Sequence, residues 1–127
     1  MNENQVATEV VDACFKIHKR LGPGLLESVY ETILEHELKA RGLSVTRQKA
    51  LAFKYDDITF DEGFRTDLIV DEKVIVELKS VEKTVPVHQK QLLTYLRLAD
   101  LKLGLLVNFG AAYVKDGISR VINGQIE

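Results

Sequence analysis

The chain has 127 residues, of which 46% are hydrophobic and 28% charged, the range of an ordinary globular domain. A formal net charge of −2 argues against a dedicated, tight DNA binder, whose surface is usually basic, although a local basic patch remains compatible with it. No apolar run reaches the roughly 18 residues that a membrane span needs, and the polar, partly acidic first residues do not read as a signal peptide.

The length predicts a single domain over residues 1–127. The single cysteine, Cys14, cannot form an internal disulfide, which indicates a reducing compartment and hence a cytoplasmic protein. Cys14 lies at helical spacing among apolar residues, so we expect a buried, unreactive thiol.

Two helices are expected in the first third of the chain. Apolar residues recur at helical spacing from Val6 to Leu21, and Gly22-Pro23-Gly24 ends this pattern. A second helical pattern runs from Leu26 to Leu38 and ends at Arg41-Gly42, a basic last turn followed by a glycine.

Short strands are expected next, and a hairpin follows them. Residues 43–48 and 50–55 each read as a strand, Asp56-Asp57 as a turn, and residues 58–60 as the start of a further strand. Residues 63–70 and 74–80 are two β-rich runs joined by the polar turn Asp71-Glu72-Lys73, the pattern of a hairpin.

The last third predicts a helix between strands. Pro86 suits a first helical position, residues 87–99 follow helical spacing, and residues 103–109 form a nearly continuous apolar strand. The unit from Val74 to Phe109 therefore predicts two parallel strands joined by a crossover helix. Asp116-Gly117, between residues 113–115 and 118–122, predicts a second hairpin. The whole is a mixed sheet with helices packed on it.

The hairpin at residues 63–80 brings charged side chains together. If Val70 and Val74 close its turn as a pair, Asp67 faces Glu77, with Cβ atoms about 5 Å apart. Alternation places Glu77 and Lys79 on one face, while the other face is filled by Leu68, Val70, Val74, Val76 and Leu78. Two carboxylates so close repel unless a cation lies between them or one is protonated, and such hard oxygen ligands suit Mg²⁺.

Simpler interpretations of these charges stay open. Arg65–Asp67 and Glu77–Lys79 are also typical of ion pairs on the wet face of a hairpin. The following helix argues against this, because charges beneath it need a reason. On that helix Gln91 and Tyr95 share a face and either reach over the carboxylates or, with His88, form a partly exposed polar stripe.

Glu27 opens the second helix, where the helix dipole favours an acidic residue whatever its function. Glu27, Glu31 and Glu35 also form an acidic row typical of a solvated face. His18, on the first helix, is expected to be structural, although the tight Gly-Pro-Gly turn keeps it close to Glu27 in the chain.

Taken together, these motifs resemble known families over nearly the whole chain. Gly24, Glu27 and Tyr30 resemble the signature of the GxxExxY protein family. Asp67, Glu77-Leu78-Lys79 and Gln91…Tyr95 resemble the PD-(D/E)XK nuclease superfamily, with a RecB-like glutamine–tyrosine motif. The resemblance implies an α/β (α+β) fold with a restriction-endonuclease-like core, in which Glu27, Asp67, Glu77 and Lys79 meet at the sheet. One departure is that Thr66, and not a proline, precedes Asp67.

The first functional hypothesis is a metal-dependent nuclease. Asp67, Glu77 and the Leu78 carbonyl would hold Mg²⁺ or Mn²⁺, with Glu27 as a further ligand. Lys79 would orient the attacking water or stabilise the transition state. Gln91 and Tyr95 would position the site, and the phosphate contacts of a nucleic-acid partner would fall to Arg65, Lys83 and Lys90.

The second hypothesis is a non-catalytic module that keeps the fold and binds nucleic acid or a protein partner. The small size and the negative net charge favour it. Under either hypothesis a homo-oligomer, or a partner protein, could supply the missing binding surface.

Overall fold

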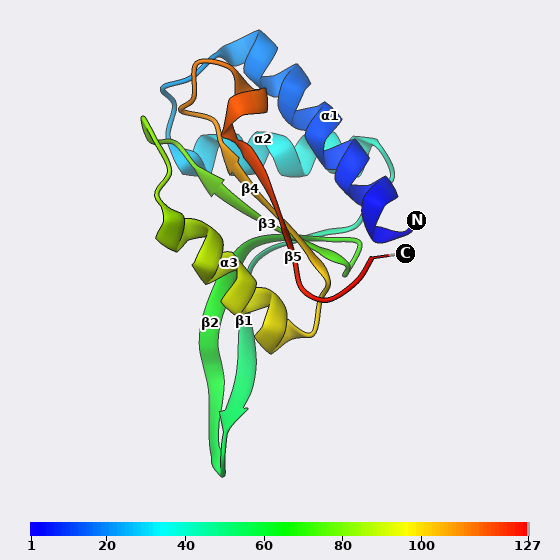
Figure 1. Ribbon diagram of the computed structural model, residues 1–127. Coiled ribbons are helices and arrows are strands. Elements are labelled where there is room, and N and C mark those ends of the chain that lie inside the picture. Colours follow the sequence, from blue (N-terminus) through cyan, green and yellow to red (C-terminus); the bar gives the residue numbers. More distant parts are fainter. Residues whose placement is uncertain (127) are drawn as a thin grey trace.

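A five-stranded sheet lies between helices in the computed structural model, which describes residues 1–126 (Figure 1). The elements in chain order are α1 (Glu3–Leu21), α2 (Glu27–Ala40), β1 (Val45–Tyr55), β2 (Ile58–Val70), β3 (Val74–Lys79), α3 (Pro86–Ala99), β4 (Leu103–Asn108), a 3₁₀ turn η1 (Val114–Gly117) and β5 (Ile118–Ile122). The strands are ordered β1-β2-β3-β4-β5, with β3 and β4 parallel and the other neighbours antiparallel. This confirms the predicted mixed sheet and the parallel pair around α3.

Helices cover both faces of this sheet, and the alternation of apolar residues explains how. Leu68, Val70, Val74, Val76 and Leu78 pack with buried residues of α1 and α2 in the main core. The intervening Ile69 and Ile75 point to the opposite face, where they pack with α3 through Leu92 and Leu96. The two-layer burial accounts for the continuous apolar sequences of β3 and β4.

The first two strands are longer than predicted and project from the body. Residues 43–48 and 50–55 do not form separate strands, because β1 continues through Gln48 to Tyr55, and β2 is likewise unbroken. β3 pairs with β2 only over Leu68–Val70. Residues 49–66, which we call the arm, therefore continue past β3 as a two-stranded hairpin. Its base packs on α3 through Leu51 and Phe64, and its far end projects from the body (Figure 1).

The predicted hairpin at Asp116-Gly117 is wrong. Val114 is buried in the main core and begins the single turn η1, so residues 113–115 form no strand before Gly117. A Cβ atom on Gly117 would lie 2.4 Å from the Asn108 carbonyl oxygen, which shows how closely this turn packs against the end of β4. β5 follows η1 and pairs with β4 instead.

The buried groups of α1 are structural. Cys14 is fully buried, and burial raises the pKa of its thiol to about 12, in keeping with an unreactive side chain. His18 is also buried, with its Nε2 atom 2.9 Å from the Ala111 carbonyl oxygen. Within residues 1–126, no helix combines the length and the hydropathy required to cross a bilayer.

The turn between α1 and α2 is fixed by Tyr30. The Tyr30 hydroxyl donates to the Gly22 carbonyl oxygen at 2.5 Å and accepts from the Leu25 amide at 3.2 Å. Its ring is fully buried and stacks on Phe109, with ring centroids 4.3 Å apart. One side chain thus fastens both ends of the Gly-Pro-Gly turn to the core.

Replacing Tyr30 with phenylalanine should lower the free energy of unfolding by about 1–2 kcal/mol, because two backbone groups lose their partner while the ring packing stays. Urea denaturation measures the loss. Tyr113→Phe is the matched control, since Tyr113 is exposed, and it should change stability by less than about 0.5 kcal/mol. Equal effects of the two substitutions would contradict the role assigned to Tyr30.

Candidate functional site

The candidate site lies where β2 and β3 part, a position that we call the fork. The register pairs Val70 with Val74, as predicted, and the ladder ends at Leu68 and Val76. Side chains then replace the ladder bonds. The Leu78 amide donates to Asp67 Oδ2 at 2.8 Å, and the Asp67 amide donates to Glu77 Oε1 at 3.3 Å. Each acidic residue of the fork is therefore bound to the opposite strand.

Glu77 is the most perturbed acid of the site. Its side chain is largely removed from solvent, with only 8% of the residue exposed. Burial raises the pKa of its carboxyl group to about 9, and the charge and side chain of the neighbouring Asp67 add to the rise, while the hydrogen bond from the Asp67 amide and the charge of Lys79 offset part of it. At neutral pH the pair therefore holds a proton in the absence of a cation.

Helix α3 covers the carboxylates with an aromatic side chain. Tyr95 stacks on Phe64 of β2 with ring centroids 4.7 Å apart. Burial raises the pKa of the Tyr95 hydroxyl, and the charges of Glu77 and Asp67 raise it further, so the phenol lies within their field. Gln91, one turn earlier on α3, is exposed.

The two surface ion pairs considered as an alternative for these charges do not form at the fork. Among residues 1–126, neither Arg65–Asp67 nor Glu77–Lys79 forms a salt bridge. Lys79 is half-buried at the end of β3, two residues after Glu77 and on the same face. Its ammonium group is left available to a ligand at the site.

Sequence reasoning missed Gln48, which binds Asp67, and the link that Gln48 makes from Asp67 to Glu31. Gln48 lies between Arg47 and Lys49, which pair with Leu68 and Thr66 on either side of Asp67. Its Nε2 atom donates to Asp67 Oδ1 at 3.3 Å and to Glu31 Oε1 at 2.8 Å. Glu31 is buried and also pairs with Arg47, whose Nη2 atom is 3.4 Å from Glu31 Oε2. The expectation of a solvated row through Glu31 and Glu35 is therefore wrong, because β1 supplies Arg47 as a counter-charge to both.

Arg65 supports this arrangement from the neighbouring strand. Gln48 has a φ of 49°, a left-handed conformation that is uncommon outside glycine. Its carbonyl oxygen accepts a hydrogen bond from Arg65 Nη1 at 2.6 Å. Arg65 thus holds the backbone of Gln48, and Gln48 in turn holds Asp67. The polar pair Arg47-Gln48, in the middle of β1, was the available signal in the sequence.

Glu27 is exposed at the first turn of α2 and makes no hydrogen bond within the described residues. The start of α2 nevertheless lies against the end of β3, because Ser80 Oγ donates to the Leu25 carbonyl oxygen at 2.6 Å. Glu27 is therefore two residues from Leu25, which contacts Ser80 next to Lys79. The glutamate that the structure links to Asp67 through Gln48 is, however, Glu31 and not Glu27.

The donor set of the fork fits a hard divalent ion with few protein ligands. No group of three or more His, Cys, Asp or Glu residues is placed to hold a metal ion in the part of the chain that is described. Mg²⁺, however, commonly keeps several waters and takes one or two carboxylates from the protein. Asp67 and Glu77 supply two, and carboxylate oxygens retain accepting capacity beside the bonds already made.

A mixed five-stranded sheet with helices on both faces, and with two carboxylates and a lysine where β2 and β3 part, is the arrangement of a restriction-endonuclease-like fold. A family model described as PD-(D/E)XK nuclease superfamily matches residues 4–121, and the chain belongs to that superfamily. No curated protein and no solved structure matches the chain.

The raised pKa of Glu77 predicts a pH-dependent stability of the metal-free protein. Between pH 4.5 and about 9 the folded state keeps a proton that the unfolded chain loses, so stability falls as pH rises through this window. Glu77→Gln, which imitates the protonated acid, should be more stable than the wild type by roughly 2–4 kcal/mol at pH 8 and equal to it near pH 4.

Urea denaturation in a chelating buffer at both pH values measures this difference. Glu62→Gln on the exposed arm is the control and should leave the pH profile unchanged. A Glu77→Gln protein no more stable than the wild type at pH 8 would show that Glu77 is ionised there.

Proposed function

We propose that the chain is a divalent-metal-dependent nuclease that hydrolyses phosphodiester bonds of nucleic acid at the fork. The observation that carries the proposal is the buried Glu77 carboxyl group hydrogen-bonded beside Asp67 under Tyr95. Asp67, Glu77 and the Leu78 carbonyl would hold Mg²⁺ or Mn²⁺. When bound, the ion supplies an activated water and neutralises charge on the scissile phosphate.

The remaining chemistry falls to side chains around the pair. Lys79 shares the face of Glu77 and is free of ion pairs within residues 1–126, so it is suited to orient the attacking water or to stabilise charge on the phosphate. Tyr95 excludes solvent from the carboxylates, and Gln91 lies one turn away at the surface of α3. Arg65 acts through Gln48 by fixing the orientation of Asp67.

The substrate would approach along the loop between β3 and α3. Lys83 and Lys90 line one shallow surface hollow with Thr84, Val85, Pro86 and Gln89. Both lysines are exposed and lie close in the chain to Lys79 and Gln91. Such cations contact phosphates without reading sequence, and they give binding that weakens as salt rises.

Within the superfamily we propose membership of the GxxExxY family. Gly24, Glu27 and Tyr30 carry the signature, and Tyr30 has a clear structural task in fastening the turn that contains Gly24. We assign Glu27 a role as a further ligand, acting through water. The bond from Ser80 to Leu25, which brings the start of α2 to the end of β3, supports this assignment.

One observation favours the second candidate, a non-catalytic module that binds nucleic acid or a protein. Glu31, the carboxylate that the structure links to Asp67, already has Arg47 as a counter-charge and accepts a hydrogen bond from Gln48. If no cation enters the fork, a proton on Glu77 and the hydrogen bonds from the Leu78 amide and Gln48 to Asp67 would hold the pair without a metal.

Incubating the protein with labelled DNA and RNA, with and without Mn²⁺, separates the two candidates. The nuclease proposal expects Mn²⁺-dependent cleavage that Lys79→Ala reduces by about 10²–10³-fold. Lys102→Ala is the control, because it removes an exposed lysine that follows α3 in the sequence, and it should cleave like the wild type. Binding without cleavage would support the module instead.

Metal binding is checked independently by thermal unfolding. At about 100 times the dissociation constant, Mn²⁺ should stabilise the wild type by roughly 2.7 kcal/mol and raise its melting temperature. Asp67→Asn should abolish that shift, because it removes one of the two carboxylates. If millimolar Mn²⁺ leaves the wild-type melting curve unchanged and calorimetry detects no binding, the nuclease proposal is to be dropped.

A further inference from the structure

The tip of the arm, residues 54–62, combines exposed apolar side chains with acidic ones. Tyr55 and Ile58 pair across the turn Asp56-Asp57 and are 68% and 56% exposed, and Phe60 beside them is 43% exposed. Four acidic residues stand against one lysine between residues 54 and 62. The tip stands clear of the body (Figure 1), so the rest of the chain does not cover it. Exposed apolar side chains grouped in this way mark an interaction site.

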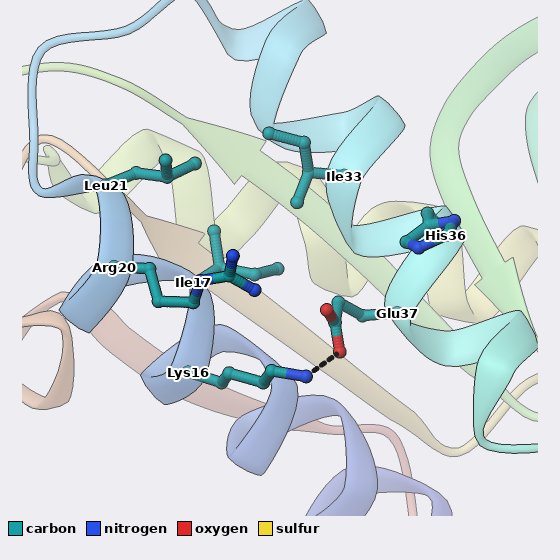
Figure 2. A pocket seen from close by; sticks show the side chains of 7 residues that line it. All are labelled: Lys16, Ile17, Arg20, Leu21, Ile33, His36 and Glu37. Carbon is teal, nitrogen blue, oxygen red and sulfur yellow. Dashed lines mark hydrogen bonds and ion pairs between the residues drawn. The ribbon is translucent and has the colours of Figure 1, made fainter.

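A hollow with the opposite charge lies between α1 and α2 at the other end of the molecule. Its volume is about 200 Å³, and it is lined by the apolar Ile17, Leu21 and Ile33 together with Lys16, Arg20, His36 and Glu37 (Figure 2). Glu37 is neutralised by Lys16, whose Nζ atom is 3.0 Å from Glu37 Oε2. Arg20 forms no ion pair with residues 1–126, so the rim of the hollow is basic.

The size of the hollow indicates what it can receive. Sites for small organic ligands usually measure about 300–1,000 Å³, so this one is small for a metabolite but sufficient for one or two apolar side chains. Leu21 is 45% exposed and Val29, one turn before Ile33 on α2, is 38% exposed, so apolar surface continues beyond the hollow. These are the properties of a pocket for anchor residues of a protein partner.

We propose that the tip of the arm of one copy docks into the α1–α2 hollow of a second copy, and that two copies exchange arms reciprocally. Tyr55 and Ile58 would supply the apolar anchors for Ile17, Leu21 and Ile33, and Asp57 would face Arg20. Both halves of the contact, an acidic apolar projection and a basic apolar recess, are present on the same chain. A second copy therefore matches the hollow without any further partner.

Reciprocity follows from the position and the size of the two surfaces. Helices α1 and α2, which line the hollow, lie at the opposite end of the fold from the β1–β2 tip (Figure 1), so a single molecule cannot join the two surfaces. One arm tip alone covers little area, whereas stable interfaces bury about 1,200–2,000 Å². Two copies of the same contact around a two-fold axis double the buried area and close the assembly.

Charge reversal with complementation tests the proposal. Sedimentation equilibrium should find the wild type dimeric at tens of micromolar, with Arg20→Glu and Asp57→Lys each weakening dimerisation by about 10-fold or more. An equal mixture of the two variants should dimerise again. Its heterodimer contains one unaltered contact and one in which the introduced lysine faces the introduced glutamate.

Controls separate this contact from general effects of charge and folding. Asp116→Lys makes the same charge change at an exposed residue of η1 and should leave the dimer intact. Ile58→Ser should weaken the dimer without any change of charge. Thermal unfolding of each variant verifies that it folds. A monomeric wild type at several hundred micromolar, or a dimer that survives both reversals, would overturn the proposal.

Discussion

The exchange of hydrogen bonds between Asp67 and the end of β3 is the interaction on which the arrangement of this protein depends. A regular ladder would have carried β2 alongside β3 to its end, with backbone groups satisfying one another. Instead the Asp67 carboxylate accepts from Leu78 and the Glu77 carboxylate accepts from Asp67. The strands can part at this point because side chains accept hydrogen bonds from the backbone amides that no longer have a partner in the opposite strand. The arm, the fork and the proximity of two acids are therefore consequences of one local substitution of bonds.

The close approach of Asp67 and Glu77 lowers the stability of the fold, and this destabilisation is confined to the fork. A carboxyl group with a pKa near 9 is a buried acid beside another acid, an arrangement that folding alone does not favour. The rest of the body is conventional, with apolar residues of β3 and β4 packed between α1 and α2 on one side and α3 on the other. Local departures of this kind, within an otherwise consistent fold, are expected at functional sites.

The sequence predicted the structure correctly where a repeating pattern of apolar and polar residues distinguished the two faces of a helix or strand. The alternation in residues 68–78 gave the register of the β2–β3 hairpin, and hence the meeting of Asp67 with Glu77, because a slip of one residue would have buried the charges. The helices followed from spacing and from stops such as Gly42. The second hairpin failed because Asp-Gly also suits a 3₁₀ turn, and burial of Val114 decided between them. The Glu31–Gln48–Asp67 connection was not predictable, since it joins three elements and depends on one left-handed residue in β1.

That left-handed residue places two opposed demands on position 48. The backbone at a φ of 49° favours glycine, which adopts this conformation without strain. The side chain must be long and must donate twice, to Glu31 and to Asp67, which glycine cannot do. Glycine at this position would relieve the backbone strain but lose both hydrogen bonds, whereas glutamine keeps the bonds to Glu31 and Asp67 and accepts the strain. In a set of related sequences, residue 48 should accordingly change in step with residues 31 and 67, because a glutamine in this strained conformation is useful only while both of its acceptors remain.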